Sequence, residues 1–221
     1  MKLALFDLDN TLLPIDSDHG WSQFLINRGV LDRAEFEARN DQFFADYKAG
    51  TLNIDEFLNF QLRPLRDNKR TQLAIWHNEF MAEVIRPNMK PSALDLVKQH
   101  QAENAVCVII TATNSFITQP IAQAFGIEAL IATEPEIVDG EYTGKVTGVP
   151  SFREGKVTRL NDWLAEKNWT LESFESSHFY SDSINDLPLL ECVSNPVAAN
   201  PDNKLAEIAQ KRRWPVIELF K

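Results

Sequence analysis

The chain opens with a short apolar run that ends in two aspartates. Residues 3–6 are all apolar, and Asp7 and Asp9 follow directly. A strand of a parallel sheet is covered on both faces and needs no alternation of polar and apolar residues, so this run predicts a buried parallel strand. The two acids then lie at its carboxyl end, where open α/β sheets bind ligands. Because residues two apart in an extended chain share a side, we expect both carboxylates to face one crevice.

A long stretch with a helical pattern follows this strand. From Ser17 to about Ile85, apolar residues recur at spacings of three and four, which predicts amphipathic helices. The predicted helices lie within residues 17–30, 32–50, 53–66 and 71–85. The second is expected to stop at Gly50 and the last before Pro87, because glycine and proline are typical helix-ending residues.

After Pro91 the pattern alternates between helices and strands. Helices are expected at 91–101, 115–126, 155–167 and 202–211, with a short one from Asp186, and strands at 105–113, 128–134, 176–183 and 214–220. Residues 136–148 carry two glycine-containing turns and predict a hairpin. This alternation predicts an α/β fold with a doubly wound parallel sheet. Residues 1–15 and 88–221 then form the core, and residues 16–87 an inserted helical domain placed to act as a lid.

The composition of the chain argues against some classes of binding partner. The 221 residues are 44% hydrophobic and 24% charged, as in an ordinary globular protein, and the net charge of -10 argues against nucleic acid or an anionic membrane as partner. The first apolar run is too short for a signal peptide, and no run approaches the ~20 residues of a membrane span, so a cytoplasmic location is expected. Cys107 and Cys192 lack the spacing of a metal site. A monomer is the default expectation.

Four more polar residues stand where strands end or helices begin. They are Thr111, Lys156, Asp182 and Asp186. Each has a plain structural alternative as a turn, cap, strand or solvated helix residue. A calcium loop starting at Asp7 is excluded, because Leu12 and Asp18 stand where such a loop needs glycine and glutamate. On a parallel sheet these polar residues converge with Asp7 and Asp9 at one edge.

The order Asp-x-Asp-x-Thr, strand threonine, lysine and Asp-x-x-x-Asp resembles the haloacid dehalogenase (HAD) superfamily, most closely its phosphoserine-phosphatase-like branch. The resemblance covers the whole chain and implies a Rossmann-like core with a helical cap. It implies that Asp7 is the nucleophile forming an aspartyl-phosphate and that Asp9 is the general acid and base. Thr111, Ala112 and Lys156 would bind the phosphoryl group. Mg²⁺ would be bound by Asp7, the backbone carbonyl of Asp9 and Asp182, with Asp186 supporting its water shell.

The chemistry is consistent with these roles. A carboxylate attacks a phosphate dianion only if nearby cations offset the repulsion, and Mg²⁺ prefers carboxylate and carbonyl oxygens. Asp9 favours a phosphoester hydrolase or phosphotransferase, because dehalogenases lack this second aspartate. Ser181 departs from the pattern, since many relatives carry glycine before the metal aspartate. A phosphotransferase or mutase, and a non-catalytic phosphate- or metal-binding module, stay open as alternatives.

Specificity is expected to reside in the helical insertion, because the core sees only the phosphate. Asp16 lies near where phosphoserine phosphatases have a glutamate that recognises the substrate ammonium, and it is equally suited to cap a helix. Arg63 and Arg66 belong to a basic cluster that either meets a substrate carboxylate or forms a solvated face. Residues 111–114, Thr-Ala-Thr-Asn, resemble relatives that act on histidinol phosphate. The expected substrate is a small amino-alcohol phosphomonoester such as histidinol phosphate or phosphoserine.

Overall fold

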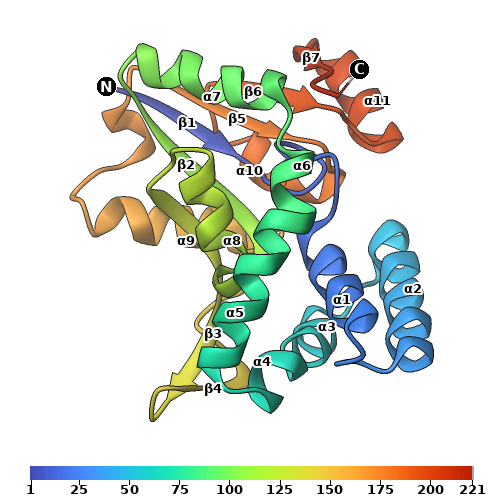
Figure 1. The fold of residues 1–221 in the computed structure, drawn as a ribbon. Coiled ribbons are helices and arrows are strands. Elements are labelled where there is room, and N and C mark those ends of the chain that lie inside the picture. The colour runs from blue at the N-terminus through green and yellow to red at the C-terminus, as the bar shows by residue number, and fades with distance from the viewer. Residues whose placement is uncertain (221) are drawn as a thin grey trace.

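A seven-stranded sheet forms the centre of the protein, whose computed structural model describes residues 1–220. The strands are β1 (Lys2–Phe6), β2 (Ala105–Asn114), β3 (Ala129–Val138), β4 (Glu141–Thr147), β5 (Ser176–Ser181), β6 (Asn195–Ala199) and β7 (Val216–Ile217). Their order is β4-β3-β2-β1-β5-β6-β7, and all neighbours are parallel except β3 and β4 (Figure 1). The doubly wound parallel sheet and the hairpin are therefore confirmed.

The strand β1 lies in the middle of the sheet and contributes to two cores. Ala4 and Phe6 pack on one face with residues of α7 (Pro91–Ala102) and α8 (Ser115–Ala124). Leu3 and Leu5 pack on the other face with residues of α9 (Glu154–Ala165), α10 (Leu187–Leu190) and α11 (Asn203–Arg212). Burial on both faces explains why the sequence of β1 shows no polar alternation.

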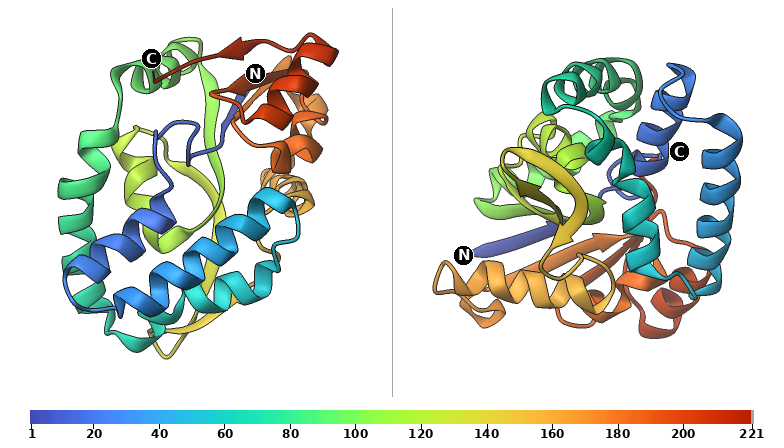
Figure 2. Two further views of the ribbon diagram at one scale, coloured as in Figure 1. Left: turned by 90° about the vertical axis from the view of Figure 1, so that its right-hand side faces the viewer. Right: turned by 90° about the horizontal axis from the view of Figure 1, so that it is seen from below.

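The helical insertion stands beyond the carboxyl end of β1 (Figures 1 and 2). It comprises α1 (Ser17–Asn27), α2 (Arg33–Ala49), α3 (Ile54–Gln61), α4 (Arg63–Asp67), α5 (Arg70–Phe80), the π-helix η1 (Met81–Ile85) and α6 (Arg86–Asn88). Asp16, Asp32 and Asn53 cap α1, α2 and α3 with their side chains, and Gly50 ends α2 in the left-handed conformation. Phe36, Phe43 and Phe60 form a separate small core among these helices. The use of residues 16–87 as a lid stays a prediction.

Four predicted boundaries are wrong, and β6 was not predicted; one of the four is the strand expected at 176–183, which ends at Ser181. Helical structure continues through Pro87 to Asn88, because the wide π-turn at Met81–Ile85 makes room for a proline that would clash in a regular α-helix. The last strand is limited to Val216–Ile217, the only residues there that pair with β6. The strand predicted at 128–134 runs on to Val138, because it also forms one arm of the hairpin. Within residues 1–220, no helix is long and apolar enough to cross a membrane.

Candidate active site

Asp7 is the first residue after β1, and both of its carboxyl oxygens are hydrogen-bonded. Its Oδ1 accepts from the ammonium of Lys156 at 2.8 Å, and its Oδ2 accepts from the hydroxyl of Thr11 at 3.1 Å. The Asp7 residue is only 7% exposed. The carboxylate therefore lies in a closed setting with a single cation in direct contact.

Lys156 reaches Asp7 from the first turn of α9. It is 2% exposed, and its Nζ also donates to Asp186 Oδ2 at 2.7 Å. The turn before the helix is tight, because a Cβ on Gly155 would lie 2.1 Å from the carbonyl oxygen of Pro150. Glycine at position 155 thus allows the close approach of backbone that aims Lys156 at the two aspartates.

Asp182 and Asp186 follow β5 and meet Asp7 through shared partners. Thr11 Oγ1 lies 3.1 Å from Asp182 Oδ1 and accepts from the Asp182 amide at 3.0 Å. Ser181 donates to Asp186 Oδ2 at 2.7 Å and accepts from the Ser183 amide at 3.2 Å. The departure from glycine at Ser181 therefore adds a donor to an aspartate that already bonds Lys156.

Asp9 has a different environment. Its Oδ1 accepts from the backbone amide of Ser17 at 2.7 Å, and its Oδ2 accepts from the hydroxyl of Thr113 at 2.7 Å. The amide of Thr113 in turn donates to Thr111 Oγ1 at 3.2 Å. Asp9 is thus held by neutral donors from α1 and β2, and Thr111 connects to it only through Thr113.

The surroundings raise the pKa of the Asp7, Asp9 and Asp182 carboxyls. Burial is the main cause of a pKa of about 6 for Asp7, which Lys156 lowers and Asp186 raises. Burial, then the charge of Asp16, raises the pKa of Asp9 to about 7. Burial also holds the pKa of Asp182 well above its ordinary value. For Lys156 burial opposes the charge, but the carboxylates of Asp186 and Asp7 outweigh it and raise its pKa.

The donor set fits a magnesium ion better than a softer metal. Within residues 1–220, no three His, Cys, Asp or Glu side chains form a preassembled metal cage. Mg²⁺ needs no such cage, because it keeps several waters and takes one or two carboxylates. Asp7 and Asp182, which share the Thr11 hydroxyl, would supply that pair. Their raised pKa values also reflect carboxylates that a cation would stabilise in the charged form.

Two further acids lie at the start of α1. Asp16 caps the helix by accepting from the amides of Asp18 and His19 at 3.0 and 2.9 Å, so its capping role is confirmed. Asp18 is 6% exposed, and burial, then Asp16 and Asp9, raises the pKa of its carboxyl well above the ordinary value. Among residues 1–220, no cation pairs with Asp16 or Asp18. These two acids near Asp9 are therefore not paired with a cation from the described part of the chain.

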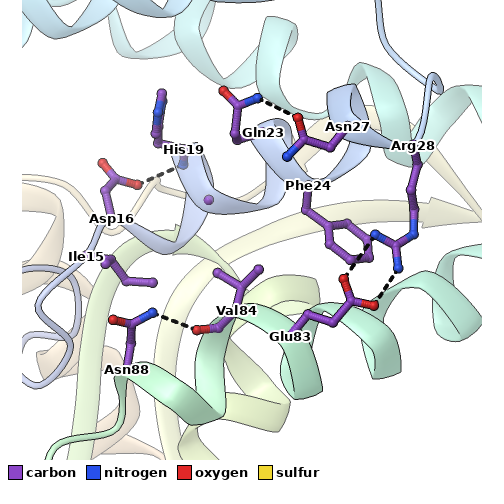
Figure 3. Close-up of a pocket in the computed structure, with 11 residues that line it drawn as sticks. Ile15, Asp16, His19, Gln23, Phe24, Asn27, Arg28, Glu83, Val84 and Asn88 are labelled. Atoms are coloured by element: carbon purple, nitrogen blue, oxygen red, sulfur yellow. Dashed lines mark hydrogen bonds and ion pairs between the residues drawn. The ribbon is translucent and has the colours of Figure 1, made fainter.

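A cavity of about 490 Å³ lies beside α1, and Figure 3 shows Asp16 at one end of it. Arg28 lies at the other end, where it pairs with Glu83 at 2.9 Å, and it also pairs with Glu79. The apolar wall between them includes Phe24 and Val84. A molecule in this cavity would meet the free charge of Asp16, whereas the charge of Arg28 is already neutralised.

The structure does not bring Arg63 and Arg66 to the aspartates. Arg63 pairs with Glu35 at 2.6 Å and lies over the Phe60 ring, and Arg66 pairs with Asp67 at 2.7 Å. Both are engaged in ion pairs within the helical insertion. The solvated-face alternative describes them better than contact with substrate does.

Sequence reasoning gave no role to Thr11, Thr113 or Ser181. Thr11 is the last residue of the Asp-x-Asp-x-Thr pattern, so its position was a usable signal. Thr113 was not predicted, because the sequence pattern favoured Thr111 as the hydroxyl that faces the acids. Thr111 and Thr113 are two residues apart in β2, and it is the Thr113 hydroxyl that donates to Asp9.

Comparison with known proteins agrees with this geometry. Residues 4–191 match the family model of haloacid dehalogenase-like hydrolases. A histidinol-phosphatase of Neisseria meningitidis serogroup C (strain 8013) is 51% identical over 217 residues, which are 98% of each chain. A crystal structure of a protein with unknown function from Bordetella pertussis Tohama I superposes with a TM-score of 0.95 at 53% identity over 99% of both chains.

A more distant structure extends the likeness of the fold. It is a phospho-aspartyl intermediate analogue of phosphoserine phosphatase, with a TM-score of 0.70 at 18% identity, covering 100% of this chain and 94% of that one. At this identity the likeness speaks for the fold alone. The family match over residues 4–191 and the 51% identical relative show that the chain belongs to the haloacid dehalogenase-like hydrolase family, within which it is a phosphatase.

Proposed function

We propose that this phosphatase hydrolyses a small amine-bearing phosphomonoester, histidinol phosphate, through an aspartyl-phosphate on Asp7. The difference between the hydrogen-bond partners of Asp7 and Asp9 is the observation that supports this reaction. Asp7 is paired with the Lys156 ammonium, as a nucleophile facing an anion requires, whereas Asp9 accepts only from neutral donors and keeps a high pKa.

The reaction proceeds in two steps. A carboxylate oxygen of Asp7 attacks phosphorus, the ester P–O bond breaks, and the leaving alkoxide takes the proton of Asp9. Water then attacks the phosphorus of the aspartyl-phosphate, the bond between phosphorus and the Asp7 oxygen breaks, and Asp9 takes up a proton from that water. Inorganic phosphate leaves and both aspartates return to their starting state.

Lys156, Thr111 and the backbone of Ala112 hold the phosphoryl oxygens in this proposal. Asp7, Asp182 and the backbone carbonyl of Asp9 would bind Mg²⁺, with Asp186 as support. The ion supplies positive charge that offsets the repulsion between the carboxylate and the phosphate. Asp186 keeps Lys156 in place, because the same ammonium bonds Asp7 and Asp186 at 2.8 and 2.7 Å.

The acids near Asp9 support an amine-bearing substrate. Asp18 is a buried carboxyl without a cation partner among the described residues, and burial favours its neutral form; a substrate ammonium next to it would favour the charged form and gain an ion pair. Asp16 adds a second carboxyl next to it. The same surroundings disfavour a substrate carboxylate, and Arg63 and Arg66 are engaged elsewhere. The balance favours histidinol phosphate, which has no carboxylate, over phosphoserine. The 51% identical relative named histidinol-phosphatase agrees with this choice.

Release of inorganic phosphate tests the proposal. The panel contains histidinol phosphate, phosphoserine and an imidazolylpropyl phosphate that lacks the amine, each with Mg²⁺ or with chelator. We expect magnesium-dependent release that is fastest from histidinol phosphate and lost in Asp7→Asn. Asp162→Asn is the matched control, because it removes a carboxylate from an exposed position of α9.

Two variants test the recognition of the amine. Asp18→Asn and Asp16→Asn, the latter keeping a good helix cap, are expected to raise KM for histidinol phosphate about tenfold while leaving p-nitrophenyl phosphate unaffected. A preference for phosphoserine would contradict the choice of substrate. Transfer of phosphate to a second alcohol in place of water would favour a phosphotransferase, and magnesium binding without turnover of any ester would favour a binding module. The cytoplasmic location and the monomeric state stay predictions.

A further inference from the structure

Arg153 makes contacts on both sides of the boundary between the helical insertion and the core. Its Nε donates to Asn185 Oδ1 at 3.0 Å, in the loop that carries Asp182 and Asp186. Its Nη2 donates to the backbone carbonyl of Gly50, at the end of α2, also at 3.0 Å. Within residues 1–220, no carboxylate forms an ion pair with this guanidinium. The Arg153 side chain therefore connects the helical insertion to the loop that carries Asp182 and Asp186, and its charge is not paired with a carboxylate of the described residues.

The backbone of Arg153 is strained. It has φ 52° and ψ -122°, a conformation that residues with a Cβ avoid and that glycine adopts freely. Glycine at this position would relieve the strain, so what the arginine adds is its side chain. Strain of this kind is typical of functional sites.

Two neighbouring contacts show how α2 sits on the core. The Tyr47 hydroxyl lies 2.8 Å from Ser183 Oγ, in the same loop as Asn185. Lys204 of α11 donates to the carbonyl of Lys48 at 3.0 Å, without touching that loop. The end of α2 is therefore held to the core by three contacts, made by Arg153, Tyr47 and Lys204. Of these, only the contact of Lys204 does not involve the loop from Asp182 to Asp186.

We propose that Arg153 is a positioning residue that couples the seating of α2 on the core to the geometry of the loop from Asp182 to Asp186. Arginine only donates hydrogen bonds, so it fixes the Asn185 amide with its oxygen toward Arg153 and its NH₂ group away. The guanidinium can donate to the Gly50 carbonyl and to the Asn185 side chain at the same time only when α2 lies against the core. The proposal rests on the proposed function for its kinetic test but has a second, substrate-free test.

The decisive variant is Arg153→Gly, because it removes the side chain and relieves the strained backbone. We expect a melting temperature equal to or above that of the unmodified protein, with kcat/KM for histidinol phosphate reduced about tenfold to a hundredfold, mainly through kcat. Lys204→Ala is the control and should change kcat/KM less than about threefold. Arg153→Lys is expected to have a kcat/KM between those of Arg153→Gly and the unmodified protein, because an ammonium is less able than a guanidinium to donate to Gly50 and Asn185 at the same time.

A double-mutant cycle tests whether Arg153 acts through Asn185. If it does, Arg153→Gly combined with Asn185→Ala is no slower than Asn185→Ala alone, within about twofold. Multiplied losses in the double variant would overturn the proposal. Unchanged kcat/KM in Arg153→Gly would also overturn it.

Hydrogen exchange measured without substrate separates this proposal from the proposed function. In Arg153→Gly we expect faster exchange both at residues 48–51 and at residues 183–186, whereas Lys204→Ala should accelerate only the first segment. Faster exchange confined to residues 48–51 in Arg153→Gly would overturn the coupling. If no ester is hydrolysed by the unmodified protein, the proposed function fails, and the exchange measurement still decides the role of Arg153.

Discussion

Asp9 accepts hydrogen bonds from two neutral donors, whereas Asp7, two residues earlier, faces the ammonium of Lys156. Both carboxyls are buried enough to have raised pKa values, about 7 for Asp9 and about 6 for Asp7. The difference follows from their neighbours, because Lys156 lowers the pKa of Asp7 and Asp16 raises that of Asp9. Two identical side chains thus differ in their environments as the proposed roles of nucleophile and proton donor require.

The pKa of Asp9 predicts the alkaline limb of the pH profile. In the proposed mechanism the first step needs protonated Asp9, whose population falls as pH rises above about 7. We therefore expect kcat/KM for an alkyl phosphate to drop roughly tenfold per pH unit well above that pKa. The p-nitrophenyl ester, whose leaving group needs no proton, should lack this limb. The same alkaline limb for both esters would contradict the role of Asp9 as the acid.

The hydrogen bonds of the Ser181 hydroxyl predict an effect of this residue on stability. Its hydroxyl bonds Asp186 and the Ser183 amide, both buried. Ser181→Ala should lower the free energy of unfolding by about 1–3 kcal/mol, because Asp186 loses a donor inside the protein. Urea unfolding measures this change, and Ser181→Gly should show a loss at least as large. An unchanged midpoint in both variants would mean that water replaces the hydroxyl without cost.

At the scale of elements, the start of α9 depends on Gly155. A methyl group there would lie 2.1 Å from the Pro150 carbonyl, and a backbone oxygen cannot rotate away from it. Gly155→Ala is expected to cost about 1–3 kcal/mol of stability and, by shifting the first turn of α9, to displace Lys156 and reduce kcat/KM.

Gly20 offers the matched control for this variant. It lies inside α1, where a Cβ would meet only side-chain atoms at 3.7–3.8 Å. Gly20→Ala should therefore raise stability by about 0.5–1 kcal/mol, since alanine is the better helix former. Thermal melting of the two variants compares them directly, and a stabilising effect of Gly155→Ala would refute the steric argument.

Sequence predicted elements best where one strong local pattern decided them. The apolar run 3–6 and the helix end at Gly50 are of this kind. The helix end predicted before Pro87 was wrong, because a π-turn accommodates this proline and has no sequence pattern of its own. Thr113 and Arg153 were not predicted because their partners, Asp9 and Asn185, are far away in the chain and depend on strand register and a strained turn.

At the scale of the whole molecule, acids gather where the helical insertion meets the core. Asp7, Asp9 and Asp182 come from the core, and Asp16 and Asp18 from the start of α1. The chain as a whole carries a net charge of -10, so the long-range field adds to the local repulsion felt by an anionic substrate. Lys156 is the one cation in direct contact with Asp7 within residues 1–220. We therefore expect the site to need added positive charge to bind a phosphate.

This concentration of acids predicts how stability depends on pH without metal. The carboxyls of Asp7 and Asp9 titrate at about 6 and 7 in the folded protein, against an ordinary value of 3.8, so between these limits the folded state holds more protons than the unfolded chain. Their contribution is therefore full below about pH 4 and is lost as pH rises through about 7. For Asp7 alone the loss is on the order of 3 kcal/mol.

Magnesium should reverse this loss, because it binds the deprotonated carboxylates of the folded state. Thermal melting in chelator and in excess Mg²⁺, at pH 5 and at pH 8, measures the effect. We expect the increase in melting temperature on adding Mg²⁺ to be larger at pH 8, where the aspartates are charged and repel one another. In Asp182→Asn the increase at pH 8 should shrink, because one proposed ligand is gone, whereas in Asp162→Asn it should persist. An equal increase at both pH values would mean that the ion binds away from the titrating acids.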